Sequence, residues 1–500
     1  MQMQNSPAFD LLITGGTIID GSKAPRFRAD IGVRHGRIAE IGNLSHRQAA
    51  QRIDASGKIV APGFIDSHTH DDQAVLSQPD MTFKISQGVT TVITGNCGIS
   101  IAPLRAGTPL PAPLSLLDDA DGTRFETFSS YLDALRQTPS AVNVAAMVGH
   151  STLRVMTMDA LEREARPDEI SAMNALLDEA LEAGAIGIST GTYYPPAAHA
   201  STQEVIDVCR PIAGTGALYV THMRDEADKS MEALEESFLI GRELNAPVVI
   251  SHHKLQRAHN FGKSSQTLAR IRQAMQCQCV ALDCYPYNAS STMLHRDPKR
   301  LVGRILISSS KPHPEQAGRE LDAIAAEWGV SKEEAAARLQ PASAVYFGMD
   351  ESDVRNILAF DETMIGSDGI PTGEKPHPRL WGTFPRILGH YSRDLGLFDL
   401  EVAVWKMTGL TARNFKLHER GTLEVGHYAD IVVFDAATIR DTASYETPAE
   451  PAQGIDAVIV NGVVTWRLGQ HMGARAGHVI ARHAASKRRD QAPCRSKASS

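Results

Sequence analysis

The first sixty residues alternate apolar and polar positions in short runs separated by glycine turns. Residues 9–13 precede Gly15-Gly16, and two further runs, residues 31–33 and 38–41, flank His35-Gly36. Alternation with a period of two predicts strands that bury one face. The beginning of the chain is therefore expected to form an antiparallel sheet.

The same alternation returns near the end of the chain. Residues 430–434 predict a strand, and residues 457–460 and 463–466 flank Asn461-Gly462, a dipeptide typical of a tight hairpin turn. We therefore expect the two chain ends to combine into one small β-sandwich domain, made of residues 1–61 and 421–483.

Between the two ends, apolar runs alternate with stretches of helical periodicity, such as the apolar stripe Ile170, Met173, Leu177 and Leu181. This alternation is typical of a parallel α/β sheet covered by helices. Eight apolar runs end near polar positions: His68-His70, Asn96-Cys97, Gly149-His150, Ser189-Thr190, Thr221-His222, Ser251-His252, Asp283-Tyr285 and Ser367-Asp368. Eight strands predict a closed (β/α)₈ TIM-like barrel over residues 62–420, with an open doubly wound sheet as the alternative.

Two segments do not fit the repeating pattern. The long interval between the last two strands, residues 288–355, predicts an inserted, mostly helical segment over the barrel mouth. Residues 484–500 are small, basic and polar, and we expect a disordered tail there.

The length and composition of the chain are compatible with a large barrel and a smaller second domain. The chain has 500 residues, of which 42% are hydrophobic and 22% charged, and its formal net charge is -8. The acidic balance argues weakly against a nucleic-acid partner. We see no signal peptide and no apolar run of about 18 residues that would span a membrane. Six cysteines in so long a chain do not make a disulfide framework, so we expect a cytoplasmic protein.

Polar side chains at the strand ends carry the candidate chemistry, because the carboxyl ends of barrel strands form the active-site face. In GFIDSHTHDD, His68 and His70 are two residues apart and point the same way, so they can share one ion. In TTVITGNCGIS, Cys97 lies at a strand end before a glycine, and a thiolate is a good zinc ligand.

Three further strand ends extend this set. ALYVTHMRDE brings His222 to the same face, and PVVISHHK brings either His252 or His253, between which periodicity does not choose. TMIGSDG places Asp368 where a general base beside a metal-activated water would stand.

Together these segments resemble the amidohydrolase superfamily, and its D-aminoacylase branch most closely. The resemblance covers nearly the whole chain and rests on GFIDSHTHDD, QGVTTVITGNCGIS, GHSTLR, GISTGTYYPPAA, THMRDE, ISHHK, DCYPYNASSTML, MIGSDGIP, HPRLWGTFPRILGHYSRDLGLF and AVWKMTGLTA. It implies deacylation of N-acyl-D-amino acids, with a small-molecule substrate as the partner and the oligomeric state left open.

The resemblance also implies roles for particular residues. It implies a tight Zn²⁺ site at Cys97, His222 and His252, and a second, weaker position at His68 and His70 with Cys97 between the two. Asp368 matches the acid/base of the family. Five residues match positions used around the substrate: Lys254, Tyr193, Tyr285, Ser291 and Arg379.

The absence of one residue type supports this branch. Many two-metal amidohydrolases bridge their ions with a carboxylated lysine on strand four, but no lysine occurs between Lys84 and Lys229, so Cys97 is the obvious bridge. This disfavours a dihydropyrimidinase or hydantoinase. A nucleobase deaminase stays open, and so does a metal-free scaffold on the same barrel, although a scaffold would be expected to lose ligands.

The substrate side chain is a separate question. The segments GHYSRDLGLF and AVWKMTGLTA resemble relatives that act on neutral, hydrophobic substrates, which we therefore expect here. The alternative is an N-acyl-D-aspartate or N-acyl-D-glutamate deacylase, which needs an additional cation for the second carboxylate. Arg296 or Lys299 in the insert would be the candidates for that cation.

Overall fold

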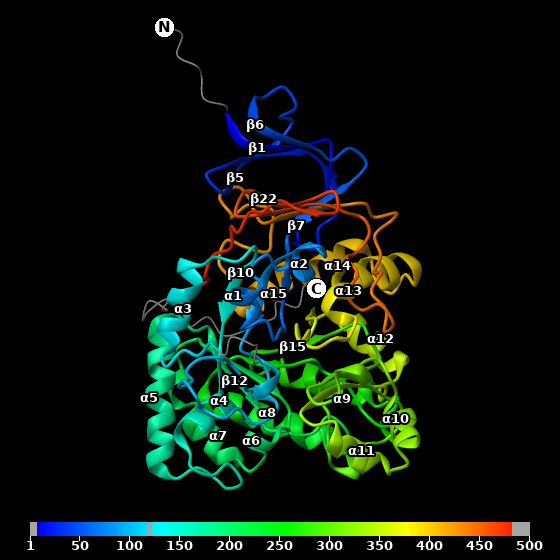
Figure 1. The fold of residues 1–500 in the computed structure, drawn as a ribbon. Coiled ribbons are helices and arrows are strands. Elements are labelled where there is room, and N and C mark those ends of the chain that lie inside the picture. The colour runs from blue at the N-terminus through cyan, green and yellow to red at the C-terminus, as the bar shows by residue number, and fades with distance from the viewer. Residues whose placement is uncertain (1–7, 118–122, 483–500) are drawn as a thin grey trace.

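The protein consists of a β-rich layer at one end and an α/β barrel below it (Figure 1). A computed structural model describes residues 8–117 and 123–482. Strands from the first and last parts of the chain lie together in the β-rich layer, and the middle of the chain forms the barrel. None of the helices in these two ranges has the length and hydropathy of a membrane-spanning segment.

Eight parallel strands make up the barrel wall, and the third of them is divided into two short strands, β10 and β11. In order they are β8 (Phe64–Asp66), β9 (Val89–Thr94), β10 (Asn143–Ala146) with β11 (Val148–Gly149), β12 (Gly187–Gly191), β13 (Leu218–His222), β14 (Val248–Ile250), β15 (Val280–Cys284) and β19 (Thr363–Ile365). Neighbouring strands pair in parallel in two sheets, β10-β9-β8 and β11-β12-β13-β14-β15-β19.

Backbone hydrogen bonds join the two sheets into a closed wall. Between the first and last strands, the amide of Asp368 donates to the carbonyl of His68 at 2.8 Å, and Thr69 bridges Gly369. On the other side, the amide of Ile186 donates to the carbonyl of Ala146 at 3.0 Å. The predicted TIM-like barrel is therefore confirmed, and the open sheet is excluded.

Side chains along each barrel strand point alternately into the barrel and outward to the helices, so there are two hydrophobic cores, one inside the barrel and one around it. Ile65, Ile93 and Val220 belong to a cluster within the barrel strands that also includes Phe415 of α15 (Gly409–Phe415). Their neighbours, such as Phe64 and Val92, pack with the helices outside.

The remaining helices of this part are α1 (Ala74–Ser77), α2 (Thr82–Ile85), α3 (Phe128–Gln137), α4 (His150–Thr157), α5 (Pro167–Ala183), α6 (Pro195–Ala198), α7 (Thr202–Val208), α8 (Ser230–Leu244), α9 (Ser264–Ala274), α12 (Glu351–Ala359), α13 (Arg379–Arg386) and α14 (Leu400–Met407), with a π-helix over Ile387–Asp394.

Helix α5 illustrates how the sequence determines where a helix begins, where it ends and which face it buries. It begins with Pro167 at its first position and acidic residues in its first turn, and it ends at Ala183, before Gly184, which has a φ of 121°. Met173, Leu177 and Leu181 are buried, as the apolar stripe predicts, and Ile170 packs partly against the same core.

Two sheets form the β-rich layer. The first has the order β5-β4-β1-β6 and the second β23-β22-β21-β20-β7-β2-β3. Their strands are β1 (Phe9–Thr14), β2 (Thr17–Ile18), β3 (Phe27–Arg28), β4 (Asp30–Arg34), β5 (Arg37–Gly42), β6 (Ala49–Asp54), β7 (Ile59–Pro62), β20 (Ile431–Phe434), β21 (Ile455–Val460), β22 (Val463–Arg467) and β23 (Gln470–His471).

Side chains from both sheets share one core, in which Leu11 and Val33 of the first sheet meet Val60 and Ile431 of the second. Strand β7 pairs with β20, so the two chain ends are joined directly. We propose the division into residues 1–61 plus 421–483 and residues 62–420 on this basis. The tail expected over residues 484–500 lies outside the described residues.

The segment over residues 288–355 differs from the mostly helical insert expected from the sequence. It contains a three-stranded antiparallel sheet, β16 (Ser290–Met293), β18 (Ala342–Tyr346) and β17 (Ile305–Ser310), covered by α10 (Leu321–Trp328) and α11 (Lys332–Arg338). Helices are present as expected, but the sheet was not expected, because its strands are short and the two edge strands both pair with β18, far along the chain. Such long-range pairing leaves little local signal.

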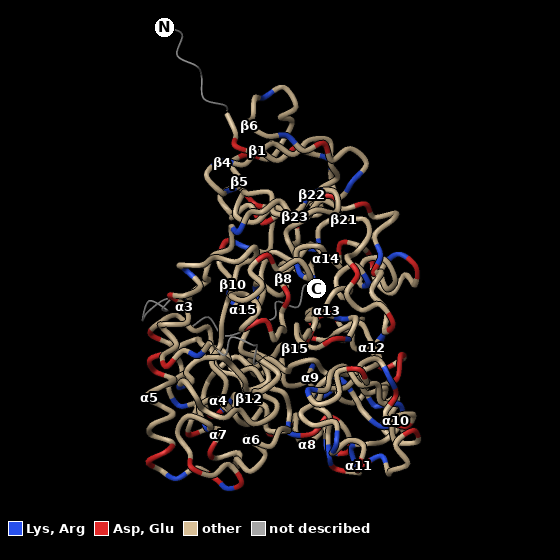
Figure 2. The backbone as a smooth tube through the Cα atoms, viewed as in Figure 1, with Lys and Arg blue, Asp and Glu red and all other residues tan. Residues whose placement is uncertain are grey.

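Charged residues of both signs are distributed over both parts of the molecule. Figure 2 shows Lys and Arg interspersed with Asp and Glu around the barrel and along the sheets. Charge therefore does not single out one outer face, and the chemistry has to be sought at the barrel mouth.

Candidate active site

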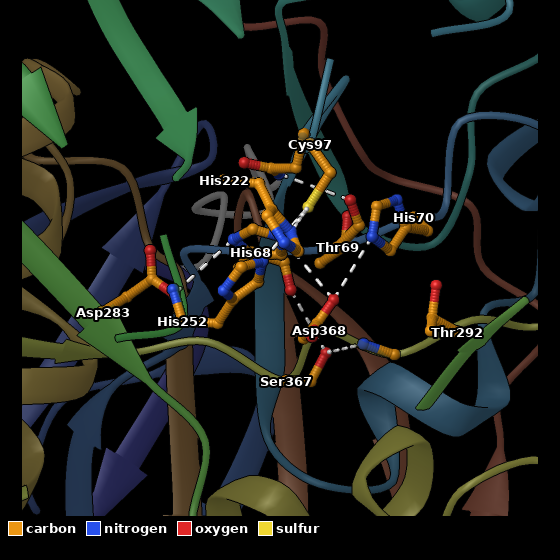
Figure 3. Close-up of polar contacts among 12 residues, drawn as sticks. His68, Thr69, His70, Cys97, His222, His252, Asp283, Thr292, Ser367 and Asp368 are labelled. Carbon is orange, nitrogen blue, oxygen red and sulfur yellow. Dashed lines mark hydrogen bonds and ion pairs between the residues drawn. The ribbon is translucent and has the colours of Figure 1, made fainter. Parts of the chain in front are cut away.

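Cys97 lies at the centre of a group of imidazoles at the carboxyl ends of the barrel strands (Figure 3). Its Sγ lies 3.2 Å from His68 Nε2, 3.2 Å from His252 Nε2 and 3.6 Å from His222 Nδ1. All four residues are buried. Side chains from β8, β9, β13 and β14 thus converge on one point, as expected when each follows a parallel strand.

Three residues of this site have a backbone conformation that is unusual for non-glycine residues. Cys97, His252 and Asp368 have φ angles of 53°, 35° and 51°. Such conformations cost about 1–3 kcal/mol each and persist where surrounding contacts hold them. Here the amide of His252 donates to Asp283 Oδ1 at 2.8 Å, and that of Asp368 donates to the carbonyl of His68. The strand ends are therefore held so that these side chains point inward.

Gly98 shows how closely the chain is packed behind Cys97. It has a φ of 75°, and a Cβ on it would lie 2.6 Å from the amide nitrogen of Gly191. Only glycine fits this position without displacing β12. The glycine after Cys97 therefore allows the loop to carry the thiol into the site.

Asp368 links the imidazoles to a buried guanidinium. Its Oδ1 lies 3.2 Å from His70 Nε2 and 3.6 Å from His68 Nε2, and its Oδ2 lies 2.9 Å from Arg379 Nη1. Burial by itself would raise the pKa of Asp368, but the Arg379 guanidinium and the neighbouring imidazoles outweigh it and hold the pKa well below its usual value. The carboxylate is therefore ionised at neutral pH.

His222 and His252 share a second set of partners. Burial lowers the pKa of both imidazoles well below the usual value, and the Lys254 ammonium lowers that of His252 further. Both rings are therefore neutral, which is the form that binds metals. Glu226 lies beside both rings, with its Oε1 3.0 Å from His252 Nδ1 and its Oε2 3.6 Å from His222 Nε2.

The donor atoms fit a zinc ion. One nitrogen or oxygen each of His68, His252 and Asp368 lies with Cys97 Sγ within 4.8 Å of all the others. A buried thiol together with imidazoles and a carboxylate is the ligand set that zinc prefers. Burial raises the pKa of the Cys97 thiol well above its usual value, so a thiolate at this place needs a cation beside it.

A second group of donors, His222, Glu226 and His252, lies next to the first. The ammonium of Lys254 already stands among them, because its Nζ lies 2.7 Å from Glu226 Oε1 and 2.7 Å from His252 Nδ1. The place that another cation would take is therefore filled by a lysine.

The structure distinguishes the two adjacent histidines after β14. His252 points to Cys97, whereas His253 Nε2 lies 2.9 Å from Thr267 Oγ1, away from the site. The six residues predicted as metal ligands and acid/base are thus brought together. Their roles stay predictions.

The five candidate substrate residues surround the same place. Arg379 Nη2 donates to the carbonyl of Ser291 at 3.0 Å. The ring of Tyr285 lies beside both cations, 4.6 Å from the Arg379 guanidinium and 5.5 Å from Lys254 Nζ. Tyr193 stacks on His222 with ring centroids 5.1 Å apart. All five are therefore near the metal-binding group, and their contacts with substrate stay a prediction.

A small cavity opens onto Cys97 and Asp368. It is lined by His70, Cys97, Ile99, Pro113, Leu116, Tyr194, Ser291, Thr292, Asp368 and Ile370. Ser291 and Thr292 come from β16, and the Thr292 hydroxyl lies 3.1 Å from that of Tyr194. The insert therefore forms one wall of the site.

The position of the insert's cations differs from the sequence-based candidates. Arg296 and Lys299 are exposed, but the guanidinium of Arg300 lies 4.1 Å from the ring centre of Tyr193. Tyr193 in turn stacks on His222. Arg300 is therefore the cation of this segment placed at the rim of the site.

Two acidic residues of the site, Glu226 and Asp283, are not among the candidates predicted from the sequence. Glu226 lies beside His222 and His252, and Asp283 Oδ1 lies 3.5 Å from His68 Nδ1. Both stand in segments that the sequence marks, THMRDE and DCYPYN, directly at or after a strand end. Their position at the strand ends is the signal that points to them.

Known proteins with similar sequences agree with the resemblance found in the sequence motifs. The sequence profile of the amidohydrolase family matches residues 51–275 and 316–466. The D-aminoacylase of Alcaligenes xylosoxydans xylosoxydans is 60% identical over 485 residues, which cover 97% of this chain and 100% of that protein.

Two solved structures are also similar. One is a D-aminoacylase studied for its binuclear metal center, with one-metal activation and second-metal attenuation; it has a TM-score of 0.93 and 61% identity, and the match covers 95% of this chain and all of that one. The other is the N-acyl-D-glutamate deacylase of Bordetella bronchiseptica with zinc and a phosphonate inhibitor that mimics the tetrahedral intermediate. Its TM-score is 0.91 and its identity 46%, over 95% of this chain and all of that one.

Proposed function

This chain belongs to the amidohydrolase family, and we propose that it hydrolyses the amide bond of N-acyl-D-amino acids to give a D-amino acid and a carboxylate. The observation that carries the proposal is the convergence of Cys97, three imidazoles and Asp368 beside the buried cation Arg379. The similarity to D-aminoacylase over the full length of that enzyme supports it and confirms the resemblance found in the sequence.

The activity is metal-dependent, and we infer that the metal is zinc. Cys97, His222 and His252 would hold the tight ion. His68 and His70 would form a second, weaker position that shares Cys97, in keeping with the binuclear center described for a D-aminoacylase. Zinc, when bound, supplies Lewis-acid chemistry, because it polarises the amide carbonyl and lowers the pKa of water toward about 7.

Asp368 is the proton carrier in this proposal. Its carboxylate is ionised, and it would take a proton from the attacking water at Oδ1, the oxygen that faces His68 and His70. It then passes that proton to the departing amine. Hydrolysis of an amide needs a base for the water and an acid for the departing amine, and in this proposal one carboxyl group serves as both.

Two cations of the site, Arg379 and Lys254, are the candidates to bind the α-carboxylate of the substrate. The planar guanidinium of Arg379 can bind a carboxylate through two parallel hydrogen bonds. Lys254 Nζ lies near the same Tyr285 ring, 5.5 Å from its centre. Carboxylate, acyl carbonyl and side chain then occupy three fixed places. Inverting the α-carbon exchanges two of them, so the L-enantiomer should be a poor substrate.

The preferred side chain is proposed to be neutral and hydrophobic. Ile99, Pro113, Leu116 and Ile370 line the cavity beside Cys97 and offer apolar contacts. Burying a side-chain carboxylate against such a surface is costly. N-acetyl-D-methionine and N-acetyl-D-leucine are therefore the expected best substrates.

Arg300 favours a second candidate, an N-acyl-D-aspartate or N-acyl-D-glutamate deacylase. Its guanidinium lies at the rim beside Tyr193 and could pair with a side-chain carboxylate. The rim is partly open to water, so this pairing would be screened more than one inside the cavity.

A panel of substrates tests both candidates. The values of kcat/KM for the N-acetyl derivatives of D-methionine, D-leucine, D-aspartate and D-glutamate should be highest for the first two. Replacing Arg300 with leucine (Arg300→Leu) should leave those values nearly unchanged. Higher values for the acidic substrates, lost in Arg300→Leu, would instead assign the chain to the second candidate.

A further inference from the structure

The turn that carries Cys97 is hydrogen-bonded to β12, a strand that supplies none of the six predicted metal and acid/base residues. We propose that Ser189 of β12 is the positioning residue that holds this turn, and with it the thiol, at the centre of the imidazoles. The proposal rests on the zinc-dependent function proposed above. Ser189 binds neither metal nor substrate in it, and acts only through the backbone around Cys97.

The Ser189 hydroxyl closes the turn of residues 95–98. Its Oγ accepts a hydrogen bond from the amide of Gly98 at 2.9 Å and donates its own proton to the carbonyl of Gly95. In an ordinary β-turn, the carbonyl of the first residue accepts directly from the amide of the fourth. Here the serine hydroxyl stands between these two groups and binds both, with Cys97 inside the turn.

The backbone of this turn needs such support. Gly95, Cys97 and Gly98 have φ angles of 77°, 53° and 75°, in the left-handed region that glycine adopts easily and cysteine does not. Ser189 is fully buried, and buried backbone groups need hydrogen-bond partners. An alanine at residue 189 would remove the partner of the Gly98 amide and of the Gly95 carbonyl together, so the turn is expected to shift.

Two glycines allow the turn to lie directly against the neighbouring strand ends. A Cβ on Gly191 would lie 2.1 Å from the carbonyl oxygen of Cys97, and one on Gly149 would lie 2.4 Å from the carbonyl oxygen of Gly98. Gly149 has a φ of -93°, which any residue adopts, so close approach of the turn is the reason for a glycine there. The turn is thus in close contact with the ends of β11 and β12, and Ser189 lies in the same segment of β12 as Gly191.

The place of the turn matters because the sulfur stands among three rings. Cys97 Sγ lies within 3.6 Å of nitrogens of His68, His222 and His252. Bonds between zinc and its ligands tolerate deviations of only about 0.2 Å. A thiol that moves with a loosened turn would therefore be a weaker ligand, although its chemistry is unchanged.

The first test is the zinc affinity of Ser189→Ala, measured by competition with a chelator on zinc-loaded protein. We expect a loss of about tenfold or more, the usual effect of removing a residue that orients a metal ligand. The unsubstituted protein gives the reference value.

Ser151→Ala is the matched control. Ser151 is as buried as Ser189, and its Oγ lies 3.1 Å from a Cβ built on Gly98, so it stands beside the same turn. Within the described part of the chain, however, this hydroxyl has no hydrogen-bond partner. Ser151→Ala thus removes the same atom beside the same turn without breaking a hydrogen bond, and its zinc affinity should be unchanged.

A second test separates local positioning from a general loss of stability. The rate at which iodoacetamide alkylates Cys97 is followed by peptide mass spectrometry on the full chain, as purified and after chelation, and divided by the rate for Cys209, which packs in the hydrophobic core. General loosening of the fold would expose both thiols. After chelation the ratio should rise several-fold in Ser189→Ala, because only the Cys97 turn is released, and stay constant in Ser151→Ala.

Unchanged zinc affinity in Ser189→Ala, an equal loss in Ser151→Ala, or an unchanged ratio of alkylation rates would overturn the proposal. The failure of the proposed function would look different, because the unsubstituted protein would then bind no zinc and release no amine from N-acetyl-D-amino acids. The alkylation ratio would in that case still decide whether Ser189 holds the turn.

Discussion

Arg379 Nη1 lies 2.9 Å from Asp368 Oδ2, so the candidate carboxylate-binding cation and the candidate proton carrier are in direct contact. Both side chains are buried, and the guanidinium contributes to the low pKa of the carboxyl group. A substrate carboxylate that binds Arg379 would therefore also change the surroundings of Asp368. Recognition of the substrate and readiness of the base are linked through this pair.

Asp368→Ala should keep its fold and its zinc but lose most of kcat. General acid–base catalysis contributes typically about 10²–10⁴-fold, so a loss of this size is expected. Steady-state kinetics with N-acetyl-D-methionine and a zinc determination on the same sample measure both effects. A loss below tenfold would reject the proton-carrier role, and loss of zinc together with activity would make Asp368 mainly a ligand.

Cys97→Ala should release the tightly bound zinc, because it removes the soft ligand at the centre of the site. Elemental analysis of the purified variant gives the zinc content per chain. Cys209→Ala is the matched control, since Cys209 is equally buried but packs in the hydrophobic core. Full zinc content and activity in Cys97→Ala would mean that this thiol also serves only in packing.

Lys84→Met should destabilise the protein by about 3–5 kcal/mol, the usual cost of removing one partner from a buried ion pair. Lys84 Nζ lies 2.7 Å from Asp66 Oδ2 and donates to Ser367 Oγ at 2.9 Å, so it joins β8 to the end of β19 beneath the site. Urea denaturation measures the loss.

The control for this change is Lys23→Met, at an exposed lysine 3.7 Å from Asp361. Surface pairs of this kind contribute about 0–1 kcal/mol. Equal small effects in both variants would show that the buried pair does not hold the strands together.

Asp72→Asn should stabilise the protein relative to the unsubstituted chain, and increasingly so as pH rises from about 4 to about 7. Burial raises the pKa of Asp72 from 3.8 to about 7, and the Gly95 amide offsets only part of this. Between these two values the folded state binds a proton more tightly than the unfolded state, so stability falls as pH rises. Asparagine cannot lose that proton.

Denaturation of both proteins at pH 5 and pH 8 checks the sign. The gain from Asp72→Asn should be larger at pH 8. A gain that is equal at both values, or larger at pH 5, would show that this carboxyl group does not titrate in the folded protein in this range.

Much of the barrel and most of the site residues can be predicted from the sequence. Strand alternation and the apolar runs predict the eight strand ends, and parallel strands must bring those ends to one face, so His68, Cys97 and Asp368 could be grouped without coordinates. The choice between His252 and His253 could not be made from periodicity. It depends on the left-handed backbone at His252, which turns this side chain toward Cys97.

Other features depend on distant partners. Glu226 looks like any acidic loop residue until the loops after β13 and β14 are placed beside each other. The strands of the insert pair residues that are far apart in the chain, as Ser290 and Ile305 with Tyr346, so no local pattern marks them. Arg300 likewise becomes relevant only through its contact with Tyr193.

The central claim is zinc-dependent hydrolysis of N-acyl-D-amino acids. It is tested most directly by the rate of amine release from N-acetyl-D-methionine and N-acetyl-L-methionine, measured before zinc removal, after removal with a chelator, and after zinc is restored. We expect rapid release from the D-enantiomer only, its loss with the metal, and its return with zinc. Equal rates on both enantiomers, or full activity in the metal-free protein, would contradict it.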